Sequence, residues 1–164
     1  MTFTVRPPGP ADAREIADLH VATWRETYTH LLPDGFFDDE FVQGRHRMWQ
    51  HIVAEPRADL IARVAEQEGR IIGFAVSGHP IGPLADEAPR DRQLYMLYLS
   101  AAHHGAGAGQ ALLEAVLGDD PALLWVAKDN PRAIAFYRRN GFEFDGVEQV
   151  DAAAPRIIDA RMVR

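Results

Sequence analysis

The chain has 164 residues, 47% of them apolar, which is enough for a single domain over residues 1–164 with a substantial core. It contains no cysteine, and this excludes disulfides, thiolate metal sites and cysteine nucleophiles. Acidic residues outnumber Lys and Arg by 24 to 17 and no basic run occurs, so we expect no nucleic-acid partner. No stretch approaches 18 apolar residues and no leader pattern is visible, so we expect no membrane span and a cytoplasmic location.

The first half of the sequence predicts a strand, two helices and a hairpin. Residues 3–6 have strand character and end at two prolines, after which Asp12 can cap a helix. A second helix is predicted over residues 38–54. Two apolar segments, 60–65 and 71–77, are separated by a short polar stretch with a glycine, and a hairpin is the economical connection between them.

The second half alternates strands and helices and has clear boundary residues. Asn130 and Pro131 supply an N-cap and a proline for the first helical position, while Gly118 and Gly141 end helices. The predicted elements are a loop at 79–92, a strand at 93–100, a helix that begins near 107, a strand at 123–127, a helix to about 140, and closing strands at 142–150 and 157–163. Mixed helices and strands in this order indicate an α/β or α+β sheet protein.

Three glycines, Gly105, Gly107 and Gly109, stand between a predicted strand and the helix that follows it. The N–H groups in the first turn of a helix have no partners within the helix and carry the positive end of its dipole. A glycine-rich approach therefore makes them an anion site. The spacing does not fit a GxxxxGK[ST] loop, and Gln110 stands where a dinucleotide loop has its third glycine, so dinucleotide binding is a remote alternative. A second alternative, that the glycines only permit a tight turn and close packing, stays open.

The segment His104 to Gly109, HGAGAG, resembles the Q/R-x-x-G-x-G/A acyl-CoA loop of the GCN5-related N-acetyltransferases. The resemblance covers nearly the whole chain. Residues 5–33 are similar to the first strand and paired helices of that family, and residues 129–146 are similar to its fourth helix and sixth strand. It implies an α/β (α+β) fold with a mixed, largely antiparallel central sheet of six to seven strands and helices on both faces.

The same resemblance implies acetyl-CoA as the acetyl donor and CoA as the product. The pyrophosphate would lie on the backbone of the glycine loop, the pantetheine would follow a strand backbone, and an asparagine would contact the cofactor. The implied residues are His104, Gly105, Ala106, Gly107, Ala108 and Gly109 in the loop, Leu97, Tyr98 and Leu99 in the strand, and Asn130.

Two residues depart from the family pattern. His104 replaces the usual Gln or Arg at the head of the loop, and a backbone anion site can survive that change because its N–H groups bind the phosphate. Gln93 stands where several relatives carry a glutamate that could relay protons, and an amide cannot act as a base.

The resemblance makes Tyr137 the candidate general acid that protonates the departing thiolate, a role that suits a phenol. The alternative is a core tyrosine on a packing face. The base is left unassigned among Glu26, His79, Asp91 and a chain of waters.

Trp24 and Tyr28 lie four residues apart and therefore on one helix face. The family uses this segment to wall the acceptor site, and aromatic rings can receive an amine by cation–π contact. A core role for both rings is an equal alternative. The remaining histidines are interpreted as ordinary helix-face residues, namely His20, His46 and His51, and adjacent His103 and His104 lack a third ligand, so we expect no metal.

Together these features predict an acetyl-CoA-dependent N-acetyltransferase that transfers acetyl directly to a primary amine of a small molecule or peptide. Direct transfer follows in part from the missing cysteine. The alternative from another class is a non-catalytic acyl-CoA-binding module, either a sensor or a structural subunit. For assembly we allow for a homodimer.

Overall fold

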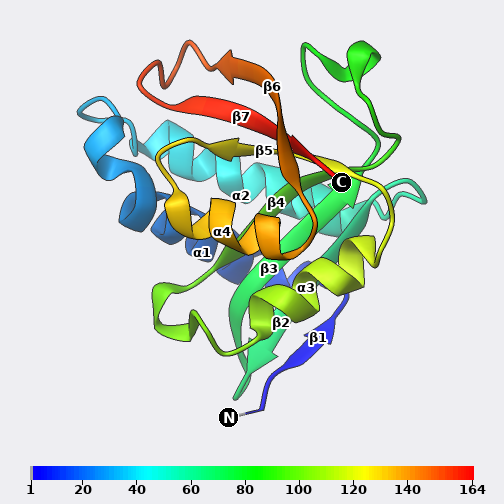
Figure 1. Cartoon of the computed structure of the whole chain (residues 1–164). Coiled ribbons are helices and arrows are strands. Elements are labelled where there is room, and N and C mark those ends of the chain that lie inside the picture. The colour runs from blue at the N-terminus through cyan, green and yellow to red at the C-terminus, as the bar shows by residue number, and fades with distance from the viewer. Residues whose placement is uncertain (1) are drawn as a thin grey trace.

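The structure is a computed structural model that describes residues 2–164. One seven-stranded sheet has the order β1-β2-β3-β4-β5-β7-β6, and four α-helices cover its two faces (Figure 1). The strands are β1 (Thr4–Arg6), β2 (Ile61–Gln67), β3 (Arg70–Gly78), β4 (Gln93–Leu99), β5 (Leu123–Ala127), β6 (Glu143–Val150) and β7 (Ile158–Val163). The helices are α1 (Ala13–Tyr28), α2 (Asp39–Ala54), α3 (Ala108–Leu117) and α4 (Pro131–Arg139). Neighbouring strands are antiparallel except β4 and β5, which are parallel, and the predicted fold class is confirmed.

Local chemistry accounts for most of the element boundaries. The Asp38 carboxylate accepts a hydrogen bond from the Phe41 N–H at 2.8 Å and so begins α2. The hairpin between β2 and β3 turns at Glu68 and Gly69, which both have positive φ, as a tight two-residue hairpin requires. Gly118 ends α3 with φ +55°.

Asp12 is the N-cap residue of α1, as the sequence predicted, but its side chain makes no capping hydrogen bond to the helix. Its side chain turns back to accept the Gly9 N–H at 2.7 Å, which closes a short 3₁₀ turn at Pro10–Asp12 before the helix begins. The same carboxylate pairs with the Arg6 guanidinium at 2.8 Å, and this contact holds the pKa of Asp12 below its usual range. The tertiary ion pair therefore outcompetes the local cap.

The two faces of the sheet carry separate cores. Ile16 of α1 and Trp49 of α2 pack on Phe74, whereas Leu112 of α3 and Tyr137 of α4 belong to the core on the other face. Figure 1 shows the same division, with α3 and α4 in front of the sheet and α1 and α2 behind it. Adjacent residues of β2 and β3 alternate between these two cores, as strand geometry requires, whereas in β4 the adjacent Tyr95 and Met96 share one core at an irregularity in its pairing with β3.

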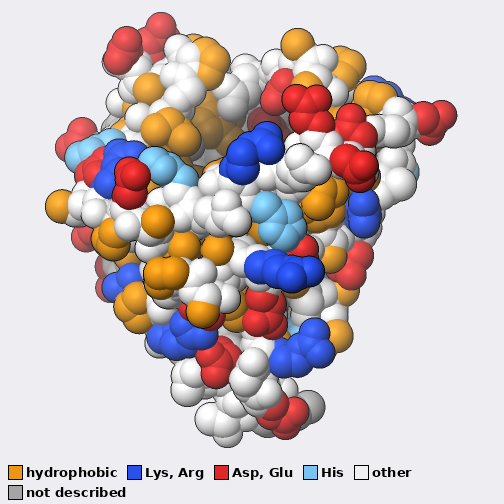
Figure 2. Space-filling model, turned by 180° about the vertical axis from the view of Figure 1, so that it is seen from behind, with side chains coloured by type: hydrophobic (Ala, Val, Ile, Leu, Met, Phe, Trp, Pro, Cys, Tyr) orange, Lys and Arg blue, Asp and Glu red, His pale blue; other side chains and the backbone are white. Residues whose placement is uncertain are grey.

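The surface is mixed in charge. Figure 2 shows Lys and Arg side chains interspersed with Asp and Glu over the face seen from behind Figure 1, and within that view the described basic side chains do not gather into a stripe. None of the helices formed by residues 2–164 has the length and apolar character needed to cross a bilayer.

His20 is a core residue and not an ordinary helix-face histidine. It is 4% exposed, its Nδ1 accepts a hydrogen bond from Trp49 Nε1 at 3.2 Å, and its ring stacks on Tyr98 at 5.2 Å. Burial, with a smaller contribution from Arg45, lowers the pKa of His20 to about 3. The imidazole is therefore neutral in the folded protein over the ordinary pH range.

This burial predicts a specific loss of stability in acid. Because the pKa of His20 is lower in the folded state than in the unfolded state, its contribution is complete above about pH 6.5 and falls as the pH drops toward 3. Between pH 7.5 and pH 5 the parent should lose about 2 kcal/mol of unfolding free energy that a His20→Gln variant does not lose. Urea unfolding of both proteins at the two pH values measures the difference, and parallel losses would contradict the assignment.

Candidate active site

The two parallel strands at the centre of the sheet diverge. β4 and β5 pair only through Gln93 with Leu123 and Leu94 with Leu124, although β4 continues to Leu99. On its other side β4 stays paired with β3 up to Leu99. Within the described residues, the β5-facing edge of β4 beyond Leu94 therefore has no β5 partner, and this is the edge on which Leu97, Tyr98 and Leu99 were predicted to offer backbone groups.

The glycine loop joins the open end of β4 to α3. Gly105 and Gly107 have φ of +81° and +87°, which side-chain-bearing residues adopt only with strain, and a Cβ at either position would meet no heavy atom within 4 Å. Gly107 is also the N-cap residue of α3. The glycines are therefore required by backbone conformation and leave the approach to the helix end free of side chains.

Several N–H groups of this loop point to no acceptor. Among the described residues, no hydrogen-bond partner is found for the N–H groups of residues 105 and 107–110, whereas those of His104 and Ala106 donate within the loop. The free groups of residues 107–110 lie at the N-cap and in the first turn of α3, at the positive end of the helix dipole, and that of Gly105 lies in the loop just before it. This arrangement fits the phosphate groups of a cofactor such as CoA.

A guanidinium that the sequence analysis missed lies at the head of the loop. Arg132, in the first turn of α4, donates from Nη1 to Nδ1 of His104, and Nε2 of His104 donates to the Leu99 carbonyl at 3.1 Å. His104 thus links β4, the loop and α4. Arg132 supplies a positive charge at the place where the motif usually has a Gln or Arg side chain. Its position could be found only from the structure, because it depends on the packing of α4 beside the loop.

Asn130 positions α4. Its Oδ1 accepts the Ala133 N–H at 3.1 Å as the predicted N-cap, and its Nδ2 donates to the Tyr28 hydroxyl at 3.4 Å. Two turns along α4, Tyr137 is 8% exposed and packs edge-on against Phe142. The cap therefore fixes the start of α4 and, through the helix, the position of Tyr137 two turns along.

Three tyrosine hydroxyls from three different elements share one electrostatic environment. Burial raises the pKa of Tyr137 and, to a smaller extent, so does Tyr28. Burial likewise raises the pKa values of Tyr28 and Tyr98, and the Tyr98 hydroxyl accepts a hydrogen bond from Trp24 Nε1 at 3.0 Å. Among the described residues the Tyr137 hydroxyl has no hydrogen-bond partner. It is therefore a protonated phenol at neutral pH that donates no hydrogen bond within the described residues.

An aromatic cluster that includes Trp24 and Tyr28, the residues predicted to wall the acceptor site, lies next to these hydroxyls. Their rings meet edge-on at 5.2 Å, and Trp24 also stacks parallel to Phe36 at 6.2 Å. Tyr28 is buried and Trp24 half-buried, so both rings also serve packing. Arg45 from α2 lies nearby, over the Phe41 ring at 4.8 Å, with no hydrogen-bond partner for its buried Nε.

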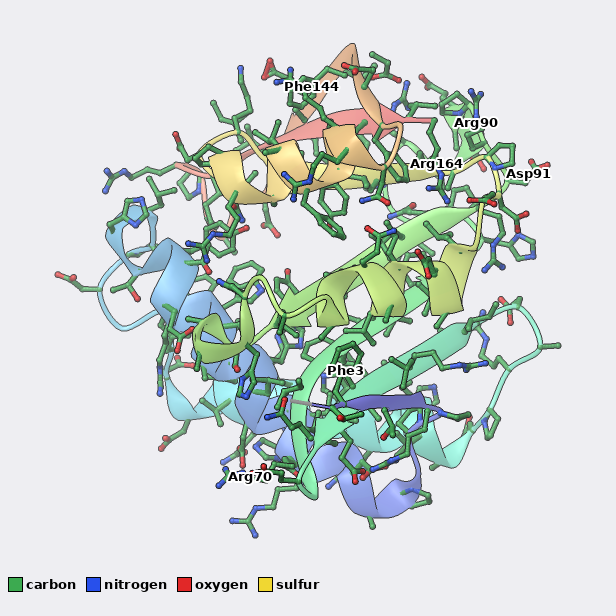
Figure 3. The ribbon with its side chains drawn as sticks, turned by 60° about the horizontal axis from the view of Figure 1, so that its bottom comes forward. Phe3, Arg70, Arg90, Asp91, Phe144 and Arg164 are labelled. Atoms are coloured by element: carbon green, nitrogen blue, oxygen red, sulfur yellow. The ribbon has the colours of Figure 1, made fainter. Side chains whose placement is uncertain are left out.

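The candidate bases from the sequence do not come together here. Glu26 is exposed on α1, and His79 and Asp91 are exposed at the end of β4 opposite to the glycine loop, where Figure 3 shows Asp91 beside Arg90 and Arg164. The His79 ring contacts the Asp91 carbonyl at 3.3 Å, and the His79 carbonyl accepts a hydrogen bond from the Tyr95 hydroxyl. Gln93 is buried, and its Oε1 accepts the Ile81 N–H at 3.0 Å, so the residue fastens the 79–92 loop.

One carboxylate that the sequence analysis did not select acts electrostatically on two of the tyrosines. Asp159 of β7 pairs with Ala127 at the open end of β5 and contributes to the raised pKa values of Tyr28 and Tyr98. Burial, and after it the charge of Asp151, raises the pKa of Asp159 itself. No local pattern marks this residue, because its role depends on which strand lies beside β5.

Comparison with known proteins agrees with this geometry. The model of the acetyltransferase (GNAT) family matches residues 14–142 of the chain. The chain belongs to the GNAT acetyltransferase family. The resemblance drawn from the sequence is thereby confirmed, as is the prediction of an acetyltransferase enzyme.

Relatives in bacteria extend the similarity over most of the chain. An uncharacterized N-acetyltransferase of Bacillus subtilis, YuaI, is 30% identical over 159 residues, which cover 88% of this chain and 87% of the relative. A probable N-acetyltransferase of Mycobacterium tuberculosis is 29% identical over 152 residues, with 87% and 80% covered. Both relatives therefore span nearly the same domain.

Solved structures share the fold of this GNAT chain. The PaiA N-acetyltransferase of Thermoplasma acidophilum, crystallised in complex with coenzyme A, superposes with a TM-score of 0.73 at 17% identity and covers 98% of both chains. A Corynebacterium glutamicum protein described as histone acetyltransferase HPA2 and related acetyltransferase gives a TM-score of 0.67 at 25% identity, covering 99% of this chain and 96% of its own.

Within residues 2–164 no group of three or more His, Asp or Glu side chains could hold a metal ion.

Proposed function

We propose that this GNAT protein transfers an acetyl group from acetyl-CoA directly to a primary amine of a small molecule or peptide. The observation that carries the proposal is the set of unpaired N–H groups at the start of α3. These groups lie beside the edge of β4 that diverges from β5. The phosphates of CoA suit the first feature, and the amide-bearing pantetheine suits an unpaired strand edge. The neighbour crystallised with coenzyme A supports the choice of ligand.

Different residues would bind different parts of acetyl-CoA. The N–H groups of Gly105, Gly107 and the first turn of α3 would hold the pyrophosphate, and Arg132 would add a charge-assisted contact. The backbone from Leu97 to Leu99 would pair with the pantetheine along the open edge of β4. Asn130 would act near the cofactor chiefly by fixing α4.

Tyr137 would act as the general acid. Acetyl transfer forms a carbon–nitrogen bond and breaks the carbon–sulfur bond, so the departing thiolate gains from a proton. The raised pKa of Tyr137 keeps its hydroxyl protonated, and no protein acceptor competes for that proton among the described residues. Trp24 and Tyr28 would face the incoming amine from α1.

Acetyl-CoA should stabilise the folded chain. At a free concentration near 100 times its dissociation constant, the expected gain is about 2.7 kcal/mol, because the ligand binds only the folded state. For a chain of this size that corresponds to roughly 5–10 °C in melting temperature. Differential scanning fluorimetry with acetyl-CoA, CoA and NAD measures it. A shift with NAD and none with either CoA species would refute the proposed cofactor.

A broad panel of primary amines, read through release of free CoA thiol, tests the transfer itself. Peptide N-termini, lysine-containing peptides and small aliphatic and aromatic amines cover the proposed acceptor class. Thermal stabilisation by acetyl-CoA with no thiol release above the acceptor-free rate for any of them would overturn acetyl transfer while leaving cofactor binding intact.

A further inference from the structure

Asp159 occupies a distinctive place in the sheet. In the antiparallel pairing of β5 and β7 it lies directly opposite Ala127, and directly opposed residues project from the same face. Ala127 belongs to the cluster formed by Tyr28, Leu31 and Leu32, on the acceptor side. The register therefore places Asp159 at the open end of β5, on the face where Ala127 packs in one cluster with Tyr28.

The carboxylate of Asp159 differs from neighbouring carboxylates because it has no ion-pair or hydrogen-bond partner in the part of the chain that the structure describes. Asp145 pairs with Arg161 at 2.7 Å, and Glu148 pairs with Lys128 at 3.0 Å, so these two cations, which lie close to Asp159 in the sequence of β7 and just after β5, are engaged with other carboxylates. Asp159 is half-buried, and among the described residues it has no ion pair and no hydrogen bond. A carboxylate withdrawn from water without a partner destabilises the fold, so its presence calls for another role.

The groups that face Asp159 leave it free to exchange a proton. The charge of Asp159 raises the pKa values of Tyr28 from α1 and Tyr98 from β4, and among the described residues the charge that shifts Asp159 itself is that of Asp151, in the connection between β6 and β7. Burial first and Asp151 second raise the pKa of the Asp159 carboxyl above its usual range. A carboxylate of this kind is a better proton acceptor than one on the surface.

We propose that Asp159 is the general base of the transfer reaction, the residue that takes the proton from the incoming ammonium group. This inference rests on the proposed function and assigns the proton acceptor that the sequence left open. In the step, one ammonium proton passes to an Oδ of Asp159 and leaves a neutral amine. The amine nitrogen then bonds to the acetyl carbon as the carbon–sulfur bond breaks.

The remaining protons balance through Tyr137 and solvent. Tyr137 gives its hydroxyl proton to the departing sulfur, and the phenolate regains a proton from the new amide nitrogen. Asp159 releases the proton it accepted to solvent, which returns both residues to their starting states. The net reaction converts an ammonium group and a thioester into an amide, a thiol and one proton.

Asp159→Asn tests the assignment, because it keeps the size of the side chain and cannot accept the proton. With the best acceptor from the amine panel, kcat at pH 7.5 should fall roughly 10²-fold, at the low end for a general base, since bulk water also deprotonates some amine. The limb of the pH–rate profile that rises from acid should disappear. The thermal shift with acetyl-CoA should be unchanged.

Stability separates this role from a structural one. Because the folded pKa of Asp159 is raised, its favourable contribution is present at low pH and is lost as the pH rises through the folded pKa. At pH 7.5 the Asn variant should therefore melt at the same temperature as the parent or higher. A lower melting temperature together with weaker acetyl-CoA binding would overturn the assignment in favour of a packing role.

Asp151→Asn is the matched control. Asp151 is exposed and raises the pKa of Asp159, so its removal should move the acid limb to lower pH and leave the plateau rate within about twofold. Turnover of Asp159→Asn within threefold of the parent, with an unaltered acid limb, would refute the proposal. A rise in KM at unchanged kcat would also refute it, because Asp159 would then only bind the ammonium group. Neither result would affect the proposed acetyl-CoA site, which the thermal shift tests separately.

Discussion

Tyr137→Phe should lower turnover by roughly 10²–10⁴, the usual range for loss of a general acid. The substitution keeps the ring that packs against Phe136 and Phe142 and deletes only the hydroxyl. Among the described residues that hydroxyl has no hydrogen-bond partner, so its removal leaves no buried group unsatisfied, and stability should change little. Acetyl-CoA affinity should likewise be retained.

The pH–rate profile identifies the role of Tyr137 most directly. An acid with a raised pKa supports turnover up to high pH, so the parent should hold its rate well above neutrality, and the variant should lose the alkaline limb. Tyr28→Phe is the matched control: it removes a neighbouring buried hydroxyl and its bond from Asn130, and it should cost less than tenfold. Parent-like turnover of Tyr137→Phe with an unchanged alkaline limb would make Tyr137 a packing residue.

Gly107→Val should weaken acetyl-CoA binding at least 100-fold, about 2.7 kcal/mol, and abolish turnover at ordinary cofactor concentrations. Gly107 caps α3 at φ +87°, where a β-branched residue is strained, and its N–H is one of the free donors. A side chain there would also stand in the approach to the helix end. Isothermal titration calorimetry measures the affinity.

The fold should survive this substitution. A Cβ at Gly107 meets no heavy atom within 4 Å, so the cost is limited to backbone strain of about 1–2 kcal/mol. Gly109→Ala is the control, because Gly109 lies within α3 and its Cβ would make an ordinary contact with the Phe136 ring at 3.8 Å. The control should bind within about threefold of the parent. Equal binding by Gly107→Val would mean that the loop serves packing and does not hold phosphate.

Features decided within a few residues could be predicted from the sequence. The Asn130 cap begins α4, the glycine stop ends α3, and β5 has the predicted bounds of residues 123–127, because caps and turns depend on φ and on neighbours three or four positions away. The glycine loop belongs to the same class, since positive φ at Gly105 and Gly107 is a local requirement. The exception is Asp12, whose carboxylate leaves the local cap for Arg6.

The constellation of the candidate site could be predicted only in part. Tyr137 and the loop came from a family resemblance, whereas periodicity in a strand or helix shows which side chains share a face but not which other element faces them. The bases expected from residue type, His79 and Asp91, lie at the far end of β4. Arg132 meets His104 because α4 packs beside the loop, a relation across 28 positions of the chain.

By itself, the sequence of this protein determined its family, its element order and the backbone conformation of the glycine loop, because each is written in residue types at fixed short spacings. The tertiary structure alone decided that β7 lies between β5 and β6. That strand order brings Asp159 to the open end of β5, where its charge acts on tyrosines from α1 and β4 and where residues 2–164 offer its carboxylate no ion pair or hydrogen bond. Strand order and register depend on packing between distant segments, so the environment that raises the pKa of Asp159 exists only once the sheet has assembled.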